Sequence, residues 1–197
     1  MMDGDYRNYG IDIARILSMF MVVLIHNLLN GGVLRFDNYG ITNLSYWLLE
    51  NLAIVAVNLF AMISGFLLVD RHWKVKKIFS LWKVVLFWSF TVTFLTMLVL
   101  HDSNWIGLIK SFFPLFFEEY WYFNAYVVLF LFIPFLNLGI VNIDKRSFNI
   151  IVLTLLILSA TVGFKGSLFE ENGYSGLWLM VMYLVGAWIK KIGRSLK

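Results

Sequence analysis

The sequence predicts an all-α, polytopic integral membrane protein with about six transmembrane helices and a cytoplasmic N-terminus. Sixty per cent of its residues are apolar and only 14% are charged, which leaves too little polar surface to cover a soluble globule of 197 residues. A membrane-spanning helix needs about 20 apolar residues. Windows of that kind occur at roughly 11–29, 44–69, 79–100, 121–141, 147–164 and 175–189.

The distribution of basic residues predicts the orientation. With the N-terminus inside, only Arg35, Lys110 and Lys165 fall on the outer side. The other thirteen basic residues are then at inner ends: Arg7, Arg15, Arg71, Lys74, Lys76, Lys77, Lys83, Lys145, Arg146, Lys190, Lys191, Arg194 and Lys197. Cytoplasmic loops carry an excess of Lys and Arg, so this asymmetry favours a cytoplasmic N-terminus.

The first window contains two polar groups in line, Arg15 and His26. Eleven helical steps amount to about three turns plus ~20°, so both side chains leave one face, ~16 Å apart in depth. Burial keeps an imidazole neutral, and a neutral His26 is a candidate general base. Asp12 is one turn before Arg15 and within reach of an ion pair. The structural alternatives are a helix-end histidine bonded to a neighbouring carbonyl and a cytoplasmic anchor pair.

The second window carries Glu50, Asn51, Asn58, Ser64 and Gly65. Asn51, Asn58 and Gly65 recur every seven residues, which predicts a polar or small stripe on one helix. Such stripes join helices by close packing and interhelical hydrogen bonds. Glu50 is the one acid well inside an outer half-span, where it either assists a histidine or meets interfacial water.

The densest basic cluster precedes and enters the third window. It consists of Arg71, Lys74, Lys76, Lys77 and Lys83. A cationic patch at a cytoplasmic helix start suits a phosphate-bearing ligand such as a nucleotide-like cofactor. Topology and anionic lipid headgroups demand much the same charges, so both explanations stay open.

Two prolines shape the region that follows. The segment around Pro114 is too short and interrupted to span, and it is typical of an amphipathic segment on the outer interface. Pro134 falls inside the fourth window, where it should kink the helix or free a carbonyl. Trp121, Tyr122 and Tyr126 open that window, as an aromatic belt at the interface or as a platform for a sugar.

Several chemistries are excluded or lack their motif. Cysteine is absent, so disulfides and an acyl-cysteine intermediate are ruled out. The sequence has no nucleophile elbow, P-loop or dinucleotide fingerprint, and the spacing of His26, His72 and His101 predicts no metal site. No internal repeat is evident, which weakens a transporter interpretation.

The D-x-x-R-x10-H pattern of Asp12, Arg15 and His26, followed by F-x-x-x-S-G-F at Phe60–Phe66, resembles acyltransferase family 3. The resemblance continues through the basic start of the third window, the W-Y-F stretch at 121–123, and GAWIKK at the end of the sixth. Members are multi-helix membrane enzymes that move acyl groups, often acetyl, from acyl-CoA to hydroxyls of surface polysaccharides or lipid-linked sugars. The resemblance thus implies a membrane O-acyltransferase in the cell membrane, with acyl-CoA as donor and no metal.

The resemblance also implies roles for particular residues. His26 is the expected catalytic histidine, with Arg15 organising the site and Asp12 paired to it. We expect the donor at Lys76, Lys77 and Lys83, although family members usually carry arginines and a proline there. The expected substrate-binding residues are Glu50, Asn58, Ser64, Trp121 and Tyr122.

The family core has about ten helices, whereas this chain offers six windows in one domain spanning 1–197. We therefore expect an N-terminal, C-terminally incomplete portion of the enzyme, whose exposed seams are covered by a second copy or by a missing C-terminal half. Lipid and a carbohydrate acceptor are the expected partners, and nucleic acid is not. Two alternatives stay open: a non-catalytic membrane component of the same fold, and a small transporter.

Overall fold

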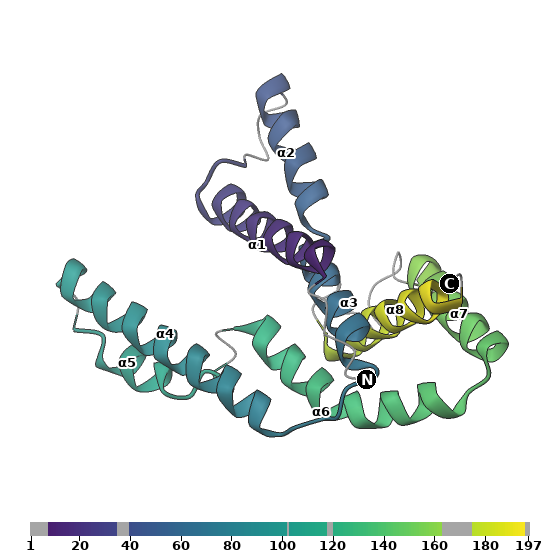
Figure 1. Ribbon diagram of the computed structural model, residues 1–197. Helices are drawn as coiled ribbons and strands as arrows, with labels where there is room; N and C mark the ends of the chain where they lie inside the picture. The colour runs from purple at the N-terminus through teal and green to yellow at the C-terminus, as the bar shows by residue number, and fades with distance from the viewer. Residues whose placement is uncertain (1–7, 35–39, 102, 118–119, 163–174, 196–197) are drawn as a thin grey trace. The chain divides into compact units, whose positions relative to one another are not determined.

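The computed structural model describes residues 8–34, 40–101, 103–117, 120–162 and 175–195. The described residues form helices and turns, with no strand among them. The helices are α1 (Tyr9–Asn30), α2 (Ile41–Ala53), α3 (Ala56–Leu68), α4 (Lys76–Leu100), α5 (Trp105–Ser111), α6 (Trp121–Asn142), α7 (Lys145–Val162) and α8 (Gly176–Ser195). Figure 1 labels them along the chain. The all-α prediction is therefore confirmed.

Five stretches among the described residues are long and apolar enough to span a membrane, against about six expected. They are α1, α2 together with α3, α4, α6 and residues 176–193 of α8. Helix α7, which reaches the edge of the described residues, is not among them. Its predicted window also continues to residue 164, beyond the described residues. The chain is a multi-pass membrane protein, while its orientation stays a prediction, since Arg7, Arg35, Lys165 and Lys197 lie outside the described residues.

The second window is not one continuous helix. Helix α2 ends at Ala53 and α3 begins at Ala56, with a turn at Ile54 and Val55. No proline or glycine marks this break. Two backbone hydrogen bonds of the helical type persist at the turn: Ile54 N–H donates to the Glu50 carbonyl at 2.9 Å, and Leu59 N–H donates to the Val55 carbonyl at 3.0 Å. The predicted seven-residue stripe is therefore divided between two helices, and its amide Asn51 is exposed and bonds the Trp47 carbonyl of its own helix.

The described chain divides into two compact units, residues 1–67 with 182–197, and residues 68–181. In the first unit α1 packs beside α2, and α3 crosses α8 (Figure 1). The crossing brings backbones together: a Cβ on Gly65 would lie 1.9 Å from the Tyr183 carbonyl oxygen, and one on Gly186 would lie 1.9 Å from the Met62 oxygen. Only glycine fits such an approach. The small residue Gly65 therefore does join helices, as the sequence predicts.

In the second unit α4 packs against α5. The ring centroids of Phe90, in α4, and Phe112, just after α5, lie 4.9 Å apart. Helix α5 ends at Ser111, and buried Pro114 follows in a turn, which confirms a short, interrupted segment there. Most large side chains of α4 are exposed, among them Phe87, Trp88 and Val99. An apolar surface of this kind suits lipid, which solvates such side chains without a protein partner.

Candidate functional site

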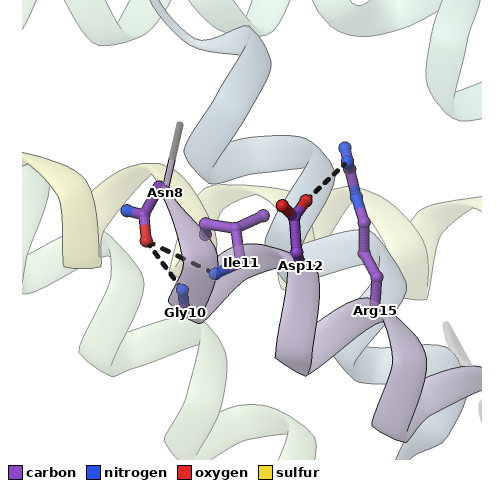
Figure 2. A network of polar contacts seen from close by, with 5 residues as sticks. All are labelled: Asn8, Gly10, Ile11, Asp12 and Arg15. Carbon is purple, nitrogen blue, oxygen red and sulfur yellow. Dashed lines mark hydrogen bonds and ion pairs between the residues drawn. The ribbon is translucent and has the colours of Figure 1, made fainter. Parts of the chain in front are cut away.

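The start of α1 is fixed by a side-chain cap. Asn8 accepts hydrogen bonds from the Gly10 and Ile11 backbone N–H groups, at 3.1 and 3.4 Å, and so satisfies donors that the first turn leaves unpaired. Figure 2 shows this cap beside Asp12 and Arg15, whose side chains approach to 3.9 Å. The predicted ion pair is confirmed. Half of the Arg15 side chain is exposed, so the pair holds its guanidinium loosely.

His26 lies on the same continuous helix as Arg15, as the predicted geometry requires. Its Nδ1 lies 2.9 Å from the Val22 carbonyl oxygen, one turn earlier. Because a carbonyl oxygen only accepts, this bond places the proton of a neutral imidazole on Nδ1. The lone pair is then on Nε2. A carbonyl contact of the kind considered as a structural alternative is thus present, and it occupies one ring nitrogen and leaves the other without that contact. The expectation that His26 is buried is wrong for the described chain, in which the side chain is exposed.

Glu50 is brought near His26 by the packing of α2 beside α1. Its side chain is 6% exposed, its Oε2 has no hydrogen-bond partner among the described residues, and its charge interacts with the His26 side chain. Asn43, also buried, lies two turns before it on the same face of α2. A buried carboxylate oxygen without a hydrogen-bond partner lowers the stability of the fold, and a functional role would explain why it is kept. The carboxylate therefore belongs to the surroundings of His26.

The signature at 60–66 has a structural explanation in the first unit. Ser64 donates its hydroxyl to the Phe60 carbonyl at 3.0 Å, within α3. Gly65 makes the crossing with α8, and the Lys190 ammonium lies 5.5 Å from the centre of the Phe66 ring. Asn58 is half-buried on the same helix. The structure thus gives Ser64 and Gly65 bonds and contacts of their own, and the substrate roles of Asn58 and Ser64 stay predictions.

The basic cluster lies in the second unit. A small pocket there is lined by the cationic side chains Arg71, Lys74 and Lys77, together with His72, Trp73, Leu68, Phe130 and Ile133. Of the predicted donor residues only Lys77 lines it. Lys76 and Lys83 lie on the first two turns of α4 and are exposed. No sequence pattern singled out His72 and Trp73 as pocket residues, although both lie inside the basic run.

The aromatic residues at the start of α6 contact one another. The Trp121 and Tyr122 rings meet edge to face with centroids 5.7 Å apart, and Tyr122 stacks on Tyr126 at 6.1 Å. All three are partly exposed. Such a cluster suits either a membrane interface or the apolar face of a sugar. Glu118 and Glu119, which precede it, lie outside the described residues.

The comparison with known families is decisive for the chain as a whole. A family model described as an acyltransferase domain, that of acyltransferase family 3, matches residues 8–197. No curated protein and no solved structure matches the chain. The match covers almost every residue, including the Asp12, Arg15 and His26 pattern and the basic cluster. The chain therefore belongs to acyltransferase family 3.

Proposed function

We propose that this membrane acyltransferase transfers an acyl group, typically acetyl, from acyl-CoA to a hydroxyl of a cell-surface polysaccharide or lipid-linked sugar in the cell membrane. The observation that carries the proposal is His26, a histidine on a membrane helix whose Nδ1 lies 2.9 Å from the Val22 carbonyl oxygen, so that a neutral ring has its lone pair on Nε2. Family membership supplies the reaction class.

In the proposed reaction, His26 Nε2 removes the proton from the acceptor hydroxyl as its oxygen attacks the thioester carbonyl carbon. The new C–O bond forms, the C–S bond breaks, and the CoA thiolate leaves with the proton that the imidazolium returns. Glu50 stabilises the transient imidazolium, because a buried carboxylate beside it lowers the cost of that positive charge. Arg15, paired with Asp12, organises the site.

The donor and acceptor belong to different clusters of residues. Phosphates of acyl-CoA bind the cationic side chains of the basic cluster, because Arg71, Lys74 and Lys77 come together around one small pocket. That pocket has a volume of only about 10 Å³, so the phosphates bind to the side chains around it and not inside it. The partly exposed rings of Trp121 and Tyr122 offer faces on which a sugar stacks. Both roles follow from side-chain chemistry and extend the family assignment.

The test is acetyl transfer from radiolabelled acetyl-CoA to a carbohydrate acceptor by the detergent-purified chain. His26→Ala and His26→Gln should each lower transfer by about 10²–10⁴-fold, the usual contribution of a general base. Asn27→Ala is the matched control, because Asn27 is the next residue and also bonds a carbonyl one turn earlier, at 2.8 Å from Val23 O. Its activity should stay near that of wild type.

Full transfer by His26→Ala would refute the base assignment. A folded wild type that binds acetyl-CoA and never turns over would instead favour a non-catalytic member of the family. Arg15→Ala should lower transfer and Arg15→Lys should restore part of it, since the lysine keeps the charge while losing the planar fork.

A further inference from the structure

Pro134 leaves an acceptor inside α6. In a regular helix the carbonyl of residue 130 receives a hydrogen bond from the N–H of residue 134, but proline has none. The Trp73 indole Nε1 donates to this Phe130 carbonyl oxygen at 2.9 Å. Its ring also contacts the Phe130 ring, with centroids 5.6 Å apart and planes inclined by 36°. The carbonyl that the sequence predicts to be free is thus bonded from a distant part of the chain.

A second hydrogen bond joins the same two parts of the chain. The Asn137 side-chain amide, almost one turn after Pro134, donates to the Leu68 carbonyl oxygen at 3.0 Å. Leu68 is the last residue of α3, where helix carbonyls lack their usual partners. The two bonds fasten the residues between α3 and α4, here named the basic segment (residues 69–75), to α6 at two points.

The fastened residues are neighbours of the pocket cations. Arg71 and His72 come directly before Trp73, and Lys74 follows it, and all three line the pocket together with Trp73. Arg71 N also bonds Leu68 O at 3.1 Å, and Lys77 N bonds Lys74 O at 3.0 Å, so turns continue from each anchored point. An ion pair between an exposed, long cationic side chain and a phosphate contributes little binding free energy, because flexible groups must be ordered to form it. A backbone that is already held in place lowers that ordering cost.

From this arrangement we infer that Trp73 and Asn137 are positioning residues for the acyl-CoA donor, acting through the basic segment, an inference that rests on the proposed function. Neither needs to touch the donor. Their bonds hold Arg71, His72 and Lys74 in the geometry that receives its phosphates, and the acceptor for one of those bonds exists because α6 contains Pro134.

The experiment compares Trp73→Phe and Asn137→Leu with two matched controls. Phenylalanine keeps an aromatic ring against Phe130 and removes the N–H, and leucine keeps the size of Asn137 without its donor. Trp88→Phe removes an exposed indole from α4, and Asn142→Leu removes an amide that bonds only one turn back in α6, to Leu138 O at 2.9 Å. Acetyl-CoA binding, KM and kcat are measured on the full chain in detergent.

Each test variant should raise the acetyl-CoA dissociation constant and KM about three- to tenfold, the range for one hydrogen bond, with kcat at saturating donor within twofold of wild type. The controls should leave both constants unchanged. A merely structural role would lower kcat through loss of folded protein without changing KM. Trypsin should also cleave after Arg71 and Lys74 faster in Trp73→Phe than in Trp88→Phe, because the basic segment is released.

The possible failures are distinguishable. If wild type binds acetyl-CoA while Trp73→Phe and Asn137→Leu match the controls in KM and in cleavage rate, the positioning role is overturned and the proposed function stands. If wild type neither binds nor turns over acetyl-CoA while folded, the proposed function falls and the donor-positioning role falls with it.

Discussion

The glycine crossing of α3 and α8 gives a stability prediction that can be worked from the structure. In Gly65→Ala the new Cβ would lie 1.9 Å from the Tyr183 carbonyl oxygen, whereas ordinary contact begins near 3.4 Å. The helices would have to separate by the difference, about 1.5 Å, because the obstacle is backbone and cannot rotate away. Separation also opens the packing around Ala61 and Ala187, both fully buried. We expect a loss of about 1–3 kcal/mol of unfolding free energy.

Gly186→Ala meets the Met62 carbonyl oxygen at the same 1.9 Å and should cost a similar amount. One separation relieves both clashes, so the double variant should lose clearly less than the sum of the two single changes. Gly139→Ala in α6 is the matched control, because a Cβ there has nothing within 4 Å. That change should be neutral or stabilising by up to about 1 kcal/mol.

The assay is denaturant unfolding in detergent micelles, followed by the loss of helical circular dichroism. Equal stability of Gly65→Ala and Gly139→Ala would refute the crossing. Strict additivity of Gly65→Ala with Gly186→Ala would show that the two glycines act at separate places, which would also contradict a single point of contact.

Three further predictions concern individual side chains. Glu50→Gln should lower kcat about ten- to a hundredfold with little change in KM, because a charge-assisted interaction is worth about 1.5–3 kcal/mol; a rise in acceptor KM alone would make Glu50 a substrate contact instead. The Ser147 backbone N–H donates to the Asp144 carboxylate at 2.9 Å and holds the pKa of Asp144 below its ordinary value. The stability that this bond contributes is therefore present above about pH 4 and is lost as the pH falls through the lowered pKa. Asp144→Asn should flatten that acid limb of a thermal-stability profile, and an unchanged limb would count against the cap. His101 caps the C-terminal end of α4 in the left-handed region, with φ of 51°. His101→Gly should therefore raise the unfolding free energy by up to about 1 kcal/mol, and a lower unfolding free energy on denaturant unfolding would show that His101 is not strained.

Local chemistry made much of α1 and α6 predictable. The ion pair of Asp12 with Arg15 and the bond of His26 to its own helix depend on residues three and four apart, which spacing alone specifies. Pro134 likewise predicts an orphaned carbonyl. What no spacing reveals is the group that bonds this carbonyl, because Trp73 is far from it in sequence.

The break between α2 and α3 could not be predicted for a different reason. Ile54 and Val55 are apolar, neither is proline or glycine, and the hydropathy of the window is continuous across them. The turn separates two helices with different packing partners, since α2 lies beside α1 and α3 lies against α8. Roles of the site residues toward substrate depend on such packing as well, and they remain predictions for the assays above.

That break also bears on how the chain fits its bilayer. The stretch Ile41–Leu68 has 28 residues, and a straight helix of that length would measure roughly 42 Å against a hydrocarbon core of ~30 Å. To place its whole length within the hydrocarbon core, such a helix would have to tilt by about 45°, well above the ~20° average for membrane helices. Two 13-residue halves can tilt separately, so that α2 follows α1 while α3 keeps its crossing with α8. We therefore expect a change in membrane thickness to alter first the angle between α2 and α3 at Ile54 and Val55, one helical turn from Glu50.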